Sequence, residues 1–439
     1  MPARFPLPRA SFLLRSLSAL LAVSALTVAP VHAQSKVAVD KTGDQFQLLV
    51  NGKPFAIHGV GGTQRLTELH AMGGNSIRTW GIESLEQKVD GKPLLDRAQE
   101  LGLMVTAGIW LQHQRNGFNY DNQQAVNEQR ERVRQAARTY KNHPALLMWG
   151  LGNEMEGPTS DGSDARVWKE VNVLAGIIKE EDPNHPVMTV IAGASGVKVK
   201  NLLQYCPNID ILGCNAYGAA SGQGAAVTQQ GWNRPFILTE FGPVGQWEVP
   251  KTSWGAPIEA DANRKAASYY ATQKMVTDDS KKICLGSYAF LWGNKQEATA
   301  TWFGMFLQSG EKLPQADAMS FAWTGAWPTD RCPKLKAITT SVTEKKVGPG
   351  VEATASAEAT QAGDGPLKYE WSVVEETKVA SVGGDHEDAP PSHPECITGT
   401  QDKALTFKTP SKPGAYRLFL VVRNDKGGAT TANVPFYVE

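Results

Sequence analysis

Cysteine is scarce in this chain of 439 residues, which contains only five: Cys206, Cys214, Cys284, Cys332 and Cys396. The five are scattered, with no CxxC pair and no spacing typical of zinc ligands. Their odd number leaves at least one thiol unpaired within a monomer. Cys214 and Cys284 lie in or beside apolar, strand-like runs, so we expect them to be buried core residues rather than ligands or nucleophiles.

An excess of charge of either sign is also missing, because 44 Lys and Arg balance 44 Asp and Glu. A chain with zero net charge has no general attraction to nucleic acid or to an anionic membrane, and we expect neither as a partner. With 41% hydrophobic and 20% charged residues, the composition excludes collagen-like, disordered and multi-span membrane classes. The length predicts about two or three domains.

The one extended apolar run lies at the start of the chain, and residues 1–33 are typical of a secretory signal. Arg4, Arg9 and Arg15 provide positive charge, the run from Ser16 to Val31 is uncharged, and small residues at Val31 and Ala33 suit a signal peptidase. The run is too short and too interrupted for a transmembrane span. No cysteine follows the site, which argues against a lipid anchor. We therefore expect cleavage after Ala33, no membrane span after it, and a secreted or periplasmic protein.

Short apolar runs recur in the rest of the chain, separated by helix-like stretches such as Pro93–Leu101 and Asn127–Tyr140. The runs are Phe55–Val60, Asn75–Trp80, Leu103–Trp110, Leu146–Glu154, Pro186–Ile191, Ile209–Tyr217, Pro235–Glu240 and Ile283–Trp292. Apolar strands that alternate with helices imply a parallel sheet covered on both faces. Eight such units favour a (β/α)8 TIM barrel, and no GxGxxG follows the first strand to support a dinucleotide fold. We predict an α/β fold with this barrel in residues 34–334.

The character of the chain changes near Pro328–Lys334. Beyond it, alternating runs at Lys368–Val374, Leu405–Lys408 and Tyr416–Arg423 are separated by turn signals, which predicts a small all-β sandwich over residues 335–439. Within it, the acidic stretch from Gly383 to Glu395 is either a calcium-binding loop or a solvated one. Before the barrel, residues 36–53 predict a hairpin.

Two glutamates finish apolar strands at the end where such a barrel carries its chemistry. The fourth strand ends in Asn153-Glu154 and the seventh in Thr239-Glu240. A carboxylate has little reason to end an apolar strand unless it points into a polar cleft, because burial of an unpaired charge is unfavourable. One such Glu is equally well explained by a salt bridge at the rim, but two together indicate a pair acting on one bound group. Glycoside cleavage needs such a pair: one carboxyl protonates the leaving oxygen, and the other stabilises or attacks the anomeric carbon.

The segments around these residues, HPALLMWGLGNEME and PFILTEFGP, resemble the acid/base and nucleophile motifs of retaining glycoside hydrolases of clan A. The resemblance is to the catalytic barrel of glycoside hydrolase family two, from about Gly52 to Trp327. Five further segments are similar to that barrel at its first, second, third, sixth and eighth strands: NGKPFAIHGV, GGNSIRTWG, LGLMV, DILGCNAYG and GSYAFLWGNKQE.

The resemblance implies roles for the matching residues. Glu154 would be the general acid/base and Glu240 the nucleophile, while Asn153 would bind the 2-hydroxyl of the sugar. Arg78 would keep Glu240 ionised, and Tyr217 would donate a hydrogen bond to it. Beside an apolar floor and a negative neighbour, Glu154 would have a raised pKa that lets it donate a proton.

Aromatic residues complete the implied site. Trp292 on the eighth strand would form a flat floor beneath the reacting sugar. Trp110, Trp247 and Trp254, in or near the loops after the third and seventh strands, either stack on further sugar rings or pack within the fold. His113 either touches the substrate or is an incidental loop residue.

The chain also departs from the family. Relatives usually carry β-sandwich domains before the barrel, whereas a short hairpin precedes it here, so we expect a more open cleft. The C-terminal part resembles immunoglobulin-like or polycystic-kidney-disease-type modules appended to secreted polysaccharide-degrading enzymes. Both differences weaken the transfer of a particular sugar preference from the family.

The sequence therefore predicts a secreted retaining β-glycoside hydrolase, acting on a β-linked oligo- or polysaccharide, with a β-glucan favoured and transglycosylation as a variant. The alternative is a non-catalytic carbohydrate-binding or envelope-scaffold protein on a TIM-barrel frame, which would be expected to have lost part of the residue set. A metal-dependent hydrolase is less favoured because the chain lacks HExxH and any histidine cluster at strand ends. No cofactor or metal is implied, and the expected partner is a glycan.

Overall fold

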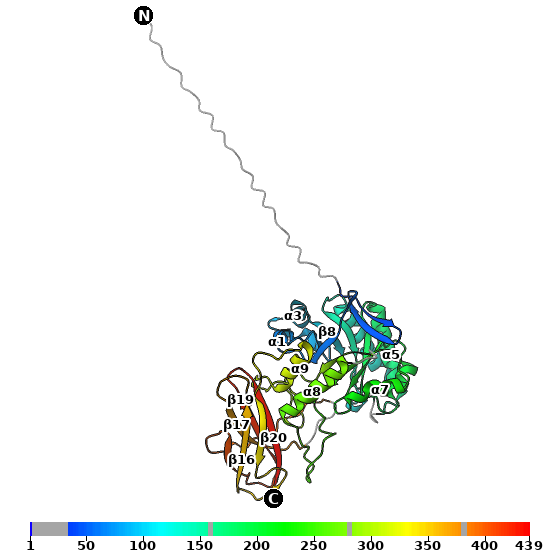
Figure 1. The fold of residues 1–439 in the computed structure, drawn as a ribbon. Helices are drawn as coiled ribbons and strands as arrows, with labels where there is room; N and C mark the ends of the chain where they lie inside the picture. The colour runs from blue at the N-terminus through cyan, green and yellow to red at the C-terminus, as the bar shows by residue number, and fades with distance from the viewer. Residues whose placement is uncertain (2–33, 157–160, 279–282, 379–383) are drawn as a thin grey trace.

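The computed structural model describes Met1 and residues 34–156, 161–278, 283–378 and 384–439. The expected signal segment and its cleavage site thus lie, except for Met1, outside the described residues. Figure 1 shows a barrel ringed by helices and, beside it, a β-rich C-terminal module that ends at the C-terminus. Helices α8 and α9 lie on the side of the barrel that faces the module.

Eight parallel strands close into a barrel, which confirms the predicted TIM-barrel fold. Each strand overlaps one of the eight predicted runs, and their order around the ring is their order in the chain. The strands are β4 (Ile57–Gly61), β5 (Ser76–Arg78), β8 (Met104–Ile109), β9 (Leu146–Leu151), β10 (Val187–Ala192), β11 (Ile211–Asn215), β12 (Phe236–Phe241) and β13 (Cys284–Ala289).

Helices cover the outside of the barrel. They are α1 (Leu66–Ala71), α2 (Glu83–Glu86), α3 (Leu94–Glu100), α4 (Gln123–Tyr140), α5 (Ala165–Glu181), α6 (Lys198–Tyr205), α7 (Gln223–Gln229), α8 (Ala262–Thr277) and α9 (Pro314–Thr324), with short 3-10 turns η1 (Gln114–Asn116) and η2 (Ala220–Gly222). The long helices α4, α5 and α8 begin where the side chains of Asn122, Asp164 and Asp261 accept hydrogen bonds from first-turn amides. A two-stranded ribbon, β6 (Lys88–Val89) and β7 (Lys92–Pro93), precedes α3.

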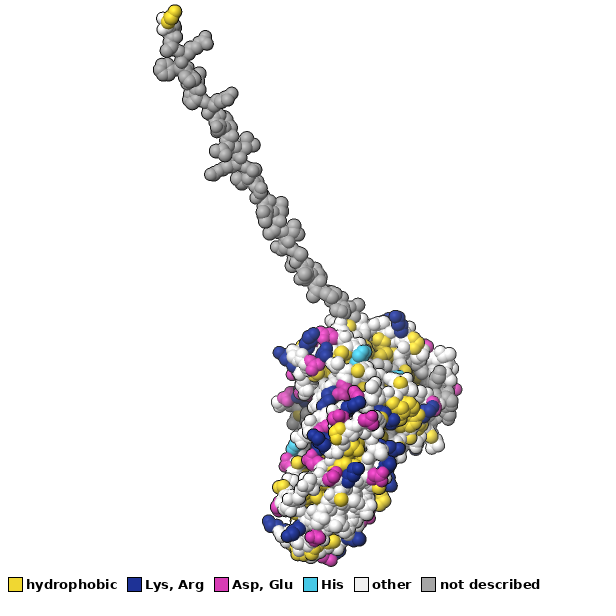
Figure 2. Space-filling model, turned by 60° about the vertical axis from the view of Figure 1, so that its left-hand side comes forward, with side chains coloured by type: hydrophobic (Ala, Val, Ile, Leu, Met, Phe, Trp, Pro, Cys, Tyr) yellow, Lys and Arg dark blue, Asp and Glu magenta, His cyan; other side chains and the backbone are white. Residues whose placement is uncertain are grey.

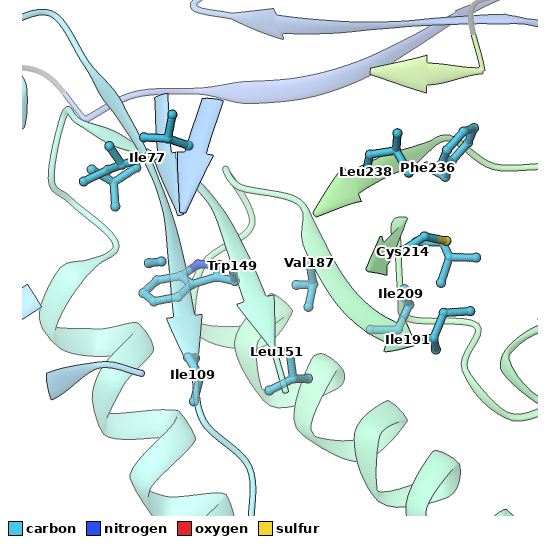
Figure 3. Close-up of a cluster of buried hydrophobic side chains, with 14 of the residues drawn as sticks. Ile77, Ile109, Trp149, Leu151, Val187, Ile191, Ile209, Cys214, Phe236 and Leu238 are labelled. Carbon is cyan, nitrogen blue, oxygen red and sulfur yellow. The ribbon is translucent and has the colours of Figure 1, made fainter. Parts of the chain in front are cut away.

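The buried residues of the barrel strands are divided between two cores, largely as the two-residue period of a strand predicts. One set faces the helices, and Figure 3 shows members of it, among them Trp149 and Leu151 on β9 and Leu238 on β12. The other set fills the barrel interior, for example Met188 and Ile237. An antiparallel hairpin, β1 (Val37–Thr42) and β2 (Gln45–Val50), followed by β3 (Lys53–Pro54), packs on this interior set and covers the amino ends of the strands. The predicted hairpin is thus present, and it leaves the carboxyl ends of the strands for the site.

The C-terminal module consists of two sheets around one shared hydrophobic core. One sheet has the order β14 (Lys334–Thr340), β16 (Glu352–Thr360), β18 (Ala404–Lys408), and the other β15 (Lys346–Val347), β20 (Ala429–Val438), β19 (Gly414–Arg423), β17 (Lys368–Glu375). A 3-10 turn, η3 (Pro394–Cys396), lies between β17 and β18. The predicted all-β character is confirmed, while the immunoglobulin-like classification stays a prediction.

A buried ionic cluster joins this module to the barrel. Arg417 on β19, 1% exposed, donates hydrogen bonds to the carbonyl oxygen of Pro257 at 2.6 Å and to Glu376 at 2.8 and 3.0 Å. It also donates to Asn433, which in turn donates to Glu259 at 2.6 Å. Glu259 is ion-paired with Lys265 of α8. The cluster therefore fixes the module against the barrel with groups that are shielded from water.

The distribution of charge on the surface and the burial of the cysteines can be compared with what the sequence predicts. Figure 2 shows acidic and basic side chains interspersed over the visible face of both parts, with no large field of one sign. Cys206, Cys214, Cys332 and Cys396 are buried free thiols, whereas Cys284 at the start of β13 is half-buried, so the expectation of a buried residue is confirmed for Cys214 and wrong for Cys284. Among the described residues, no helix combines the length and apolar character needed to cross a bilayer.

Candidate active site

Glu154 lies in a tight turn directly after β9. Gly152 (φ 73°) and Glu154 (φ 55°) both adopt left-handed backbone, and the amide of Glu154 donates a hydrogen bond to the carbonyl oxygen of Val190 on the next strand at 2.9 Å. A Cβ at position 152 would lie 2.8 Å from Cγ of Met155, so glycine is required there for space as well as for φ. A non-glycine residue in left-handed backbone is a strained arrangement of a kind that clusters at functional sites.

Glu240 lies within β12 and is held by three hydrogen-bond donors. Its Oε1 accepts from Nη1 of Arg78 at 3.0 Å and from Nε1 of Trp80 at 2.9 Å, and its Oε2 accepts from the hydroxyl of Tyr217 at 2.9 Å. Burial and the charge of Glu240 hold the pKa of Tyr217 well above its ordinary value, so the phenol stays protonated as a donor. Donors on both oxygens, one of them a guanidinium, fix the orientation of the Glu240 carboxyl group.

Glu154, in contrast to Glu240, has few hydrogen-bond donors around its carboxyl group. Its Oε1 accepts one hydrogen bond, from Nδ2 of Asn215 on β11 at 2.8 Å. Burial raises the pKa of Glu154 to about 7, and the negative charges of Glu240 and Glu156 add to this effect. The two carboxyl groups of the site thus differ because their neighbours differ: Glu240 is surrounded by donors, whereas Glu154 has one donor and lies near like charge.

Arg78 and Asn215 connect the two carboxyl groups through Asn153. Nη2 of Arg78 donates to Oδ1 of Asn153 at 2.7 Å, and Nδ2 of Asn215 lies 3.2 Å from the same oxygen. Oδ1 of Asn215 in turn accepts from Thr239 at 2.8 Å. Arg78 is 2% exposed, so its charge acts in a shielded environment. The polar network fixes the side chains of four strands or strand ends, those of β5, β9, β11 and β12, with respect to one another.

A cavity of about 1130 Å³ contains this network at the carboxyl end of the barrel. Of the residues predicted for the site, six line the cavity, namely Asn153, Glu154, Tyr217, Glu240, Trp110 and Trp247, and Arg78 lies directly behind Glu240. The ring of Trp247 lies 5.5 Å from that of Tyr217 in an edge-to-face arrangement. A cavity of this size and composition is typical of a binding site for a small molecule or part of a polymer.

Two residues of the site were missed by the sequence analysis, Trp80 and Asn215. Both could have been found from the two-residue period of a strand, because Trp80 follows Arg78 by two positions and Asn215 precedes Tyr217 by two. Each pair shares a face of the predicted runs Asn75–Trp80 and Ile209–Tyr217, although in the structure β5 ends at Arg78 and β11 at Asn215.

The structure does not bring Trp292 into the cavity, which corrects the expectation of a flat floor at that residue. Its side chain is 1% exposed and packs in the barrel–helix core with its ring 4.9 Å from that of Phe306. β13 ends at Ala289, and the two residues that follow, Phe290 and Leu291, line the cavity instead. Because β13 has ended before Trp292, the alternation of side chains along the strand does not predict which way Trp292 points.

His113 and Trp254 also lie outside this cavity. His113 is 5% exposed behind Trp110, with the two rings 4.9 Å apart. Burial, together with the charge of Arg115, lowers the pKa of His113 to about 4, so the ring is neutral at ordinary pH. Trp254 lies beside Tyr437 of the C-terminal module. Both residues therefore support the fold around the site rather than line it.

The site is built from carboxylates and amides and offers no cluster typical of a metal. Within the described parts of the chain, no group of three or more His, Cys, Asp or Glu side chains is placed to hold an ion. The acidic stretch that was a candidate calcium loop is described from Gly384 onward, and that part contains no such group either.

Comparison with known proteins gives a family match within the barrel. Residues 94–245 match the family described as glycosyl hydrolases family 2, TIM barrel domain. The chain is 27% identical over 187 residues to a beta-glucuronidase of Sus scrofa, covering 39% of this chain and 26% of that protein. It is 25% identical over 202 residues to a beta-glucuronidase of Homo sapiens, covering 41% and 27%.

The chain thus spans about a quarter of the length of the curated relatives it matches. Among solved structures, a beta-D-glucuronidase of Dictyoglomus thermophilum is similar, with a TM-score of 0.47 and 18% identity over 66% of this chain and 54% of that one. The family match and the closed eight-stranded barrel together support a glycoside hydrolase of the clan that the sequence motifs resemble.

Proposed function

We propose that the protein is a retaining β-glycoside hydrolase in which Glu240 is the nucleophile and Glu154 the general acid/base. Glu240 attacks the anomeric carbon while Glu154 donates its proton to the leaving glycosidic oxygen, which gives a covalent glycosyl-enzyme and the released aglycone. Water, activated by Glu154 as a base, then attacks the same carbon and releases Glu240. In such a mechanism, the two carboxyl groups lie about 5–5.5 Å apart.

The observation that carries this proposal is the difference between the two carboxyl groups. Three donors surround and orient Glu240, whereas burial raises the pKa of Glu154 to about 7, so Glu154 can keep its proton near neutral pH. The first step needs this pairing of an oriented nucleophile with a protonated acid. When the glycosyl-enzyme forms, Glu240 loses its charge, and the raised pKa of Glu154 falls with it. Glu154 is then ready to act as a base in the second step.

The charges around the cavity favour a neutral sugar over a uronic acid. The lining includes Glu248, Glu297 and Asp385 besides the catalytic pair, and its single described cation is Lys295. Nζ of Lys295 is already paired with Glu297 at 2.7 Å. A sugar carboxylate would therefore meet like charge and no unpaired cation, which is unfavourable. We infer a neutral β-linked glycan, with a β-glucan as the first candidate, although the relatives named above are glucuronidases.

Export and transfer complete the proposal. The signal-like segment 1–33 supports a secreted or periplasmic protein, and a C-terminal module of the immunoglobulin-like kind is common in secreted polysaccharide-degrading enzymes. A second sugar in place of water would give transglycosylation with the same two residues. The non-catalytic alternative predicts loss of part of the site, but Arg78, Asn153, Tyr217 and both glutamates are all present and joined in one hydrogen-bond network, with Glu154 linked to it through Asn215.

A product profile tests the proposal. The purified protein is incubated with β-1,3-glucan, β-1,4-glucan, mannan, xylan, galactan and glucuronoxylan, beside its Glu240→Gln variant. We expect oligosaccharides from a neutral β-glycan, absent with the variant, and products longer than the starting oligomers if transfer occurs. As a matched control, Glu358→Gln removes an exposed carboxylate of β16 and should leave the profile unchanged. Equal product formation by the parent and Glu240→Gln would refute the role of Glu240.

A further inference from the structure

One wall of the catalytic cavity comes from the C-terminal module rather than from the barrel. Gly384 and Asp385 line the same cavity as Glu154 and Glu240, although more than a hundred residues separate them in the chain. They belong to the connection between β17 and η3, which is the acidic stretch expected from the sequence to be either a calcium-binding loop or a solvated one. We call residues 384–387 the acidic wall.

The acidic wall bridges two barrel loops that are not neighbours. On one side, Nζ of Lys295, in the loop after β13, donates to the carbonyl oxygen of Gly384 at 3.1 Å. On the other side, Nη2 of Arg115, in η1 after β8, lies 3.5 Å from Oδ1 of Asp385. In the barrel, β4 and β5 lie between β13 and β8.

The bridged side of the barrel is the one where its own loops contribute least. Among described residues, the loop after β4 supplies none of the cavity lining, and the loop after β5 supplies Trp80. The acidic wall therefore occupies a side of the cavity that the barrel leaves open. The C-terminal module is therefore more than an appended domain, because it places the carboxylate of Asp385 in the lining of the catalytic cavity.

Hydrogen bonds to the barrel hold the acidic wall in position. Glu387 is 8% exposed, and its Oε1 accepts from Nε2 of Gln296 at 3.1 Å. The hydroxyl of Thr377, at the start of the same connection, lies 2.8 Å from the carbonyl oxygen of Ala298 and 3.1 Å from Oε1 of Glu387. The buried cluster around Arg417 adds a further anchor, because Arg417 binds Glu376 at the start of the connection and Pro257 of the barrel part.

We propose that Asp385 binds a sugar unit of the substrate beyond the one that reacts, so that the C-terminal module forms part of the substrate cleft. Ionised carboxylates accept hydrogen bonds from two sugar hydroxyls at once, and such charge-assisted bonds are stronger than neutral ones. Arg115 lies against Oδ1 and orients the carboxylate, which is half exposed toward the cavity. The assignment rests on the proposed glycosidase function and adds to it a preference for oligomers over short glycosides.

Chain-length kinetics test this assignment. Initial rates of the full-length parent, Asp385→Ala and Asp385→Asn are measured with p-nitrophenyl β-glucoside and with laminari- and cello-oligosaccharides of three to six units. In Asp385→Ala, the ratio of kcat/KM on the preferred hexasaccharide to that on the aryl glucoside should fall about ten-fold, mainly through KM, as expected for loss of a hydrogen bond to a charged group. Asp385→Asn should retain part of the preference, because its amide oxygen still accepts.

The matched control is Asp388→Ala in the same connection. The side chain of Asp388 is 97% exposed and pairs with His386, outside the cavity lining, so this variant should keep the parent's ratio. Thermal unfolding of all variants shows whether they are folded. An unchanged ratio in folded Asp385→Ala overturns the assignment while the parent's activity leaves the proposed function standing. A parent that neither cleaves the oligosaccharides nor binds them by calorimetry overturns the proposed function, and this assignment with it.

Discussion

Glu154 and Glu240 have identical side chains, and their neighbours alone give them different tasks. Arg78, Trp80 and Tyr217 all donate to Glu240, whereas Glu154 receives one amide donor and lies close to like charge. Removing either carboxyl group should therefore have a distinct chemical consequence, not merely a loss of rate.

The two glutamates can be told apart by chemical rescue with azide. In Glu240→Ala, turnover should fall by at least about 10³-fold, and azide with an activated aryl β-glycoside should give the α-glycosyl azide, since it attacks from the vacated face. In Glu154→Ala, the rate should fall about 10²–10⁴-fold, and azide should intercept the glycosyl-enzyme to give the β-glycosyl azide. Anomeric configuration by NMR is the readout. The same azide anomer from both variants would contradict the assignment.

The pH profile should report Glu154 directly. A general acid must be protonated, so kcat/KM should decline as the pH rises through its pKa of about 7. Asn215 donates to the ionised form and so lowers this pKa. Asn215→Ala should therefore move the alkaline limb to higher pH, on the order of one unit, while lowering the rate about ten-fold. Asn208→Ala, an amide outside the cavity lining, should leave the limb in place. An unmoved limb in Asn215→Ala would assign it to another group.

Single residues were predictable where a motif or a strand period placed them. Glu154, Glu240, Arg78, Asn153 and Tyr217 were found from strand ends and resemblance, and all of them meet in the structure. The same two-residue period within the predicted runs could have identified Trp80 and Asn215 as site residues, although neither was predicted. His113 was ambiguous because a sequence does not show which side of a loop faces the cavity.

At the scale of elements, the turn after β9 sets the position of both Asn153 and Glu154. Gly152→Ala adds a methyl group 2.8 Å from Cγ of Met155 to a left-handed backbone, so it combines strain of about 1–2 kcal/mol with overpacking of about 1–3 kcal/mol. We expect both a lower unfolding temperature and a loss of kcat of at least about ten-fold, because small displacements of catalytic groups have large effects on rate.

Gly102→Ala is the matched control for this turn. Gly102 has a similar φ of 68° with no atom within 4 Å of an added Cβ, in the turn that precedes β8 at the amino end of the barrel. It should show the backbone strain alone and keep the parent's kcat. If Gly152→Ala kept full activity as well, the turn would not be what positions Glu154.

The elements themselves were predictable because their signals are local. All eight barrel strands coincide with apolar runs, and α3 and α4 with helical patterns, since burial on both faces leaves its mark on consecutive residues. The error at Trp292 arose where this regularity ends. Beyond Ala289 the chain leaves the strand, and alternation no longer says which way a side chain points.

At the scale of the whole molecule, the position of the C-terminal module was not predictable. Its contacts join residues far apart in the chain, such as Arg417 with Pro257 and Asn433 with Glu259, and none of them carries a local sequence signal. The sequence suggested an open cleft with an appended module. The structure places part of that module in the wall of the cavity instead.

The buried cluster around Arg417 should therefore govern both stability and the use of long substrates. Burial alone would raise the pKa of Glu259, but Lys265 and Arg417 outweigh it and lower that pKa, so the carboxylate depends on its partners. Arg417→Met leaves Glu259 and Glu376 without this partner in a shielded interface and should cost about 3–5 kcal/mol of unfolding free energy. Loosening of the module should displace Asp385 and lower kcat/KM on hexasaccharides more than on aryl glycosides.

Arg423→Met isolates the effect of burial in this comparison. Arg423 lies on the same strand and also crosses to the barrel, pairing with Glu311 at 2.6 Å, but it is 22% exposed, and the loss should be below about 1 kcal/mol. Calorimetry should then show a single transition for the parent and Arg423→Met, and two for Arg417→Met, because the module and barrel no longer unfold together. Equal stability and one transition in both variants would mean that the apolar contacts at this interface suffice, and that the ionic cluster does not hold the module in place.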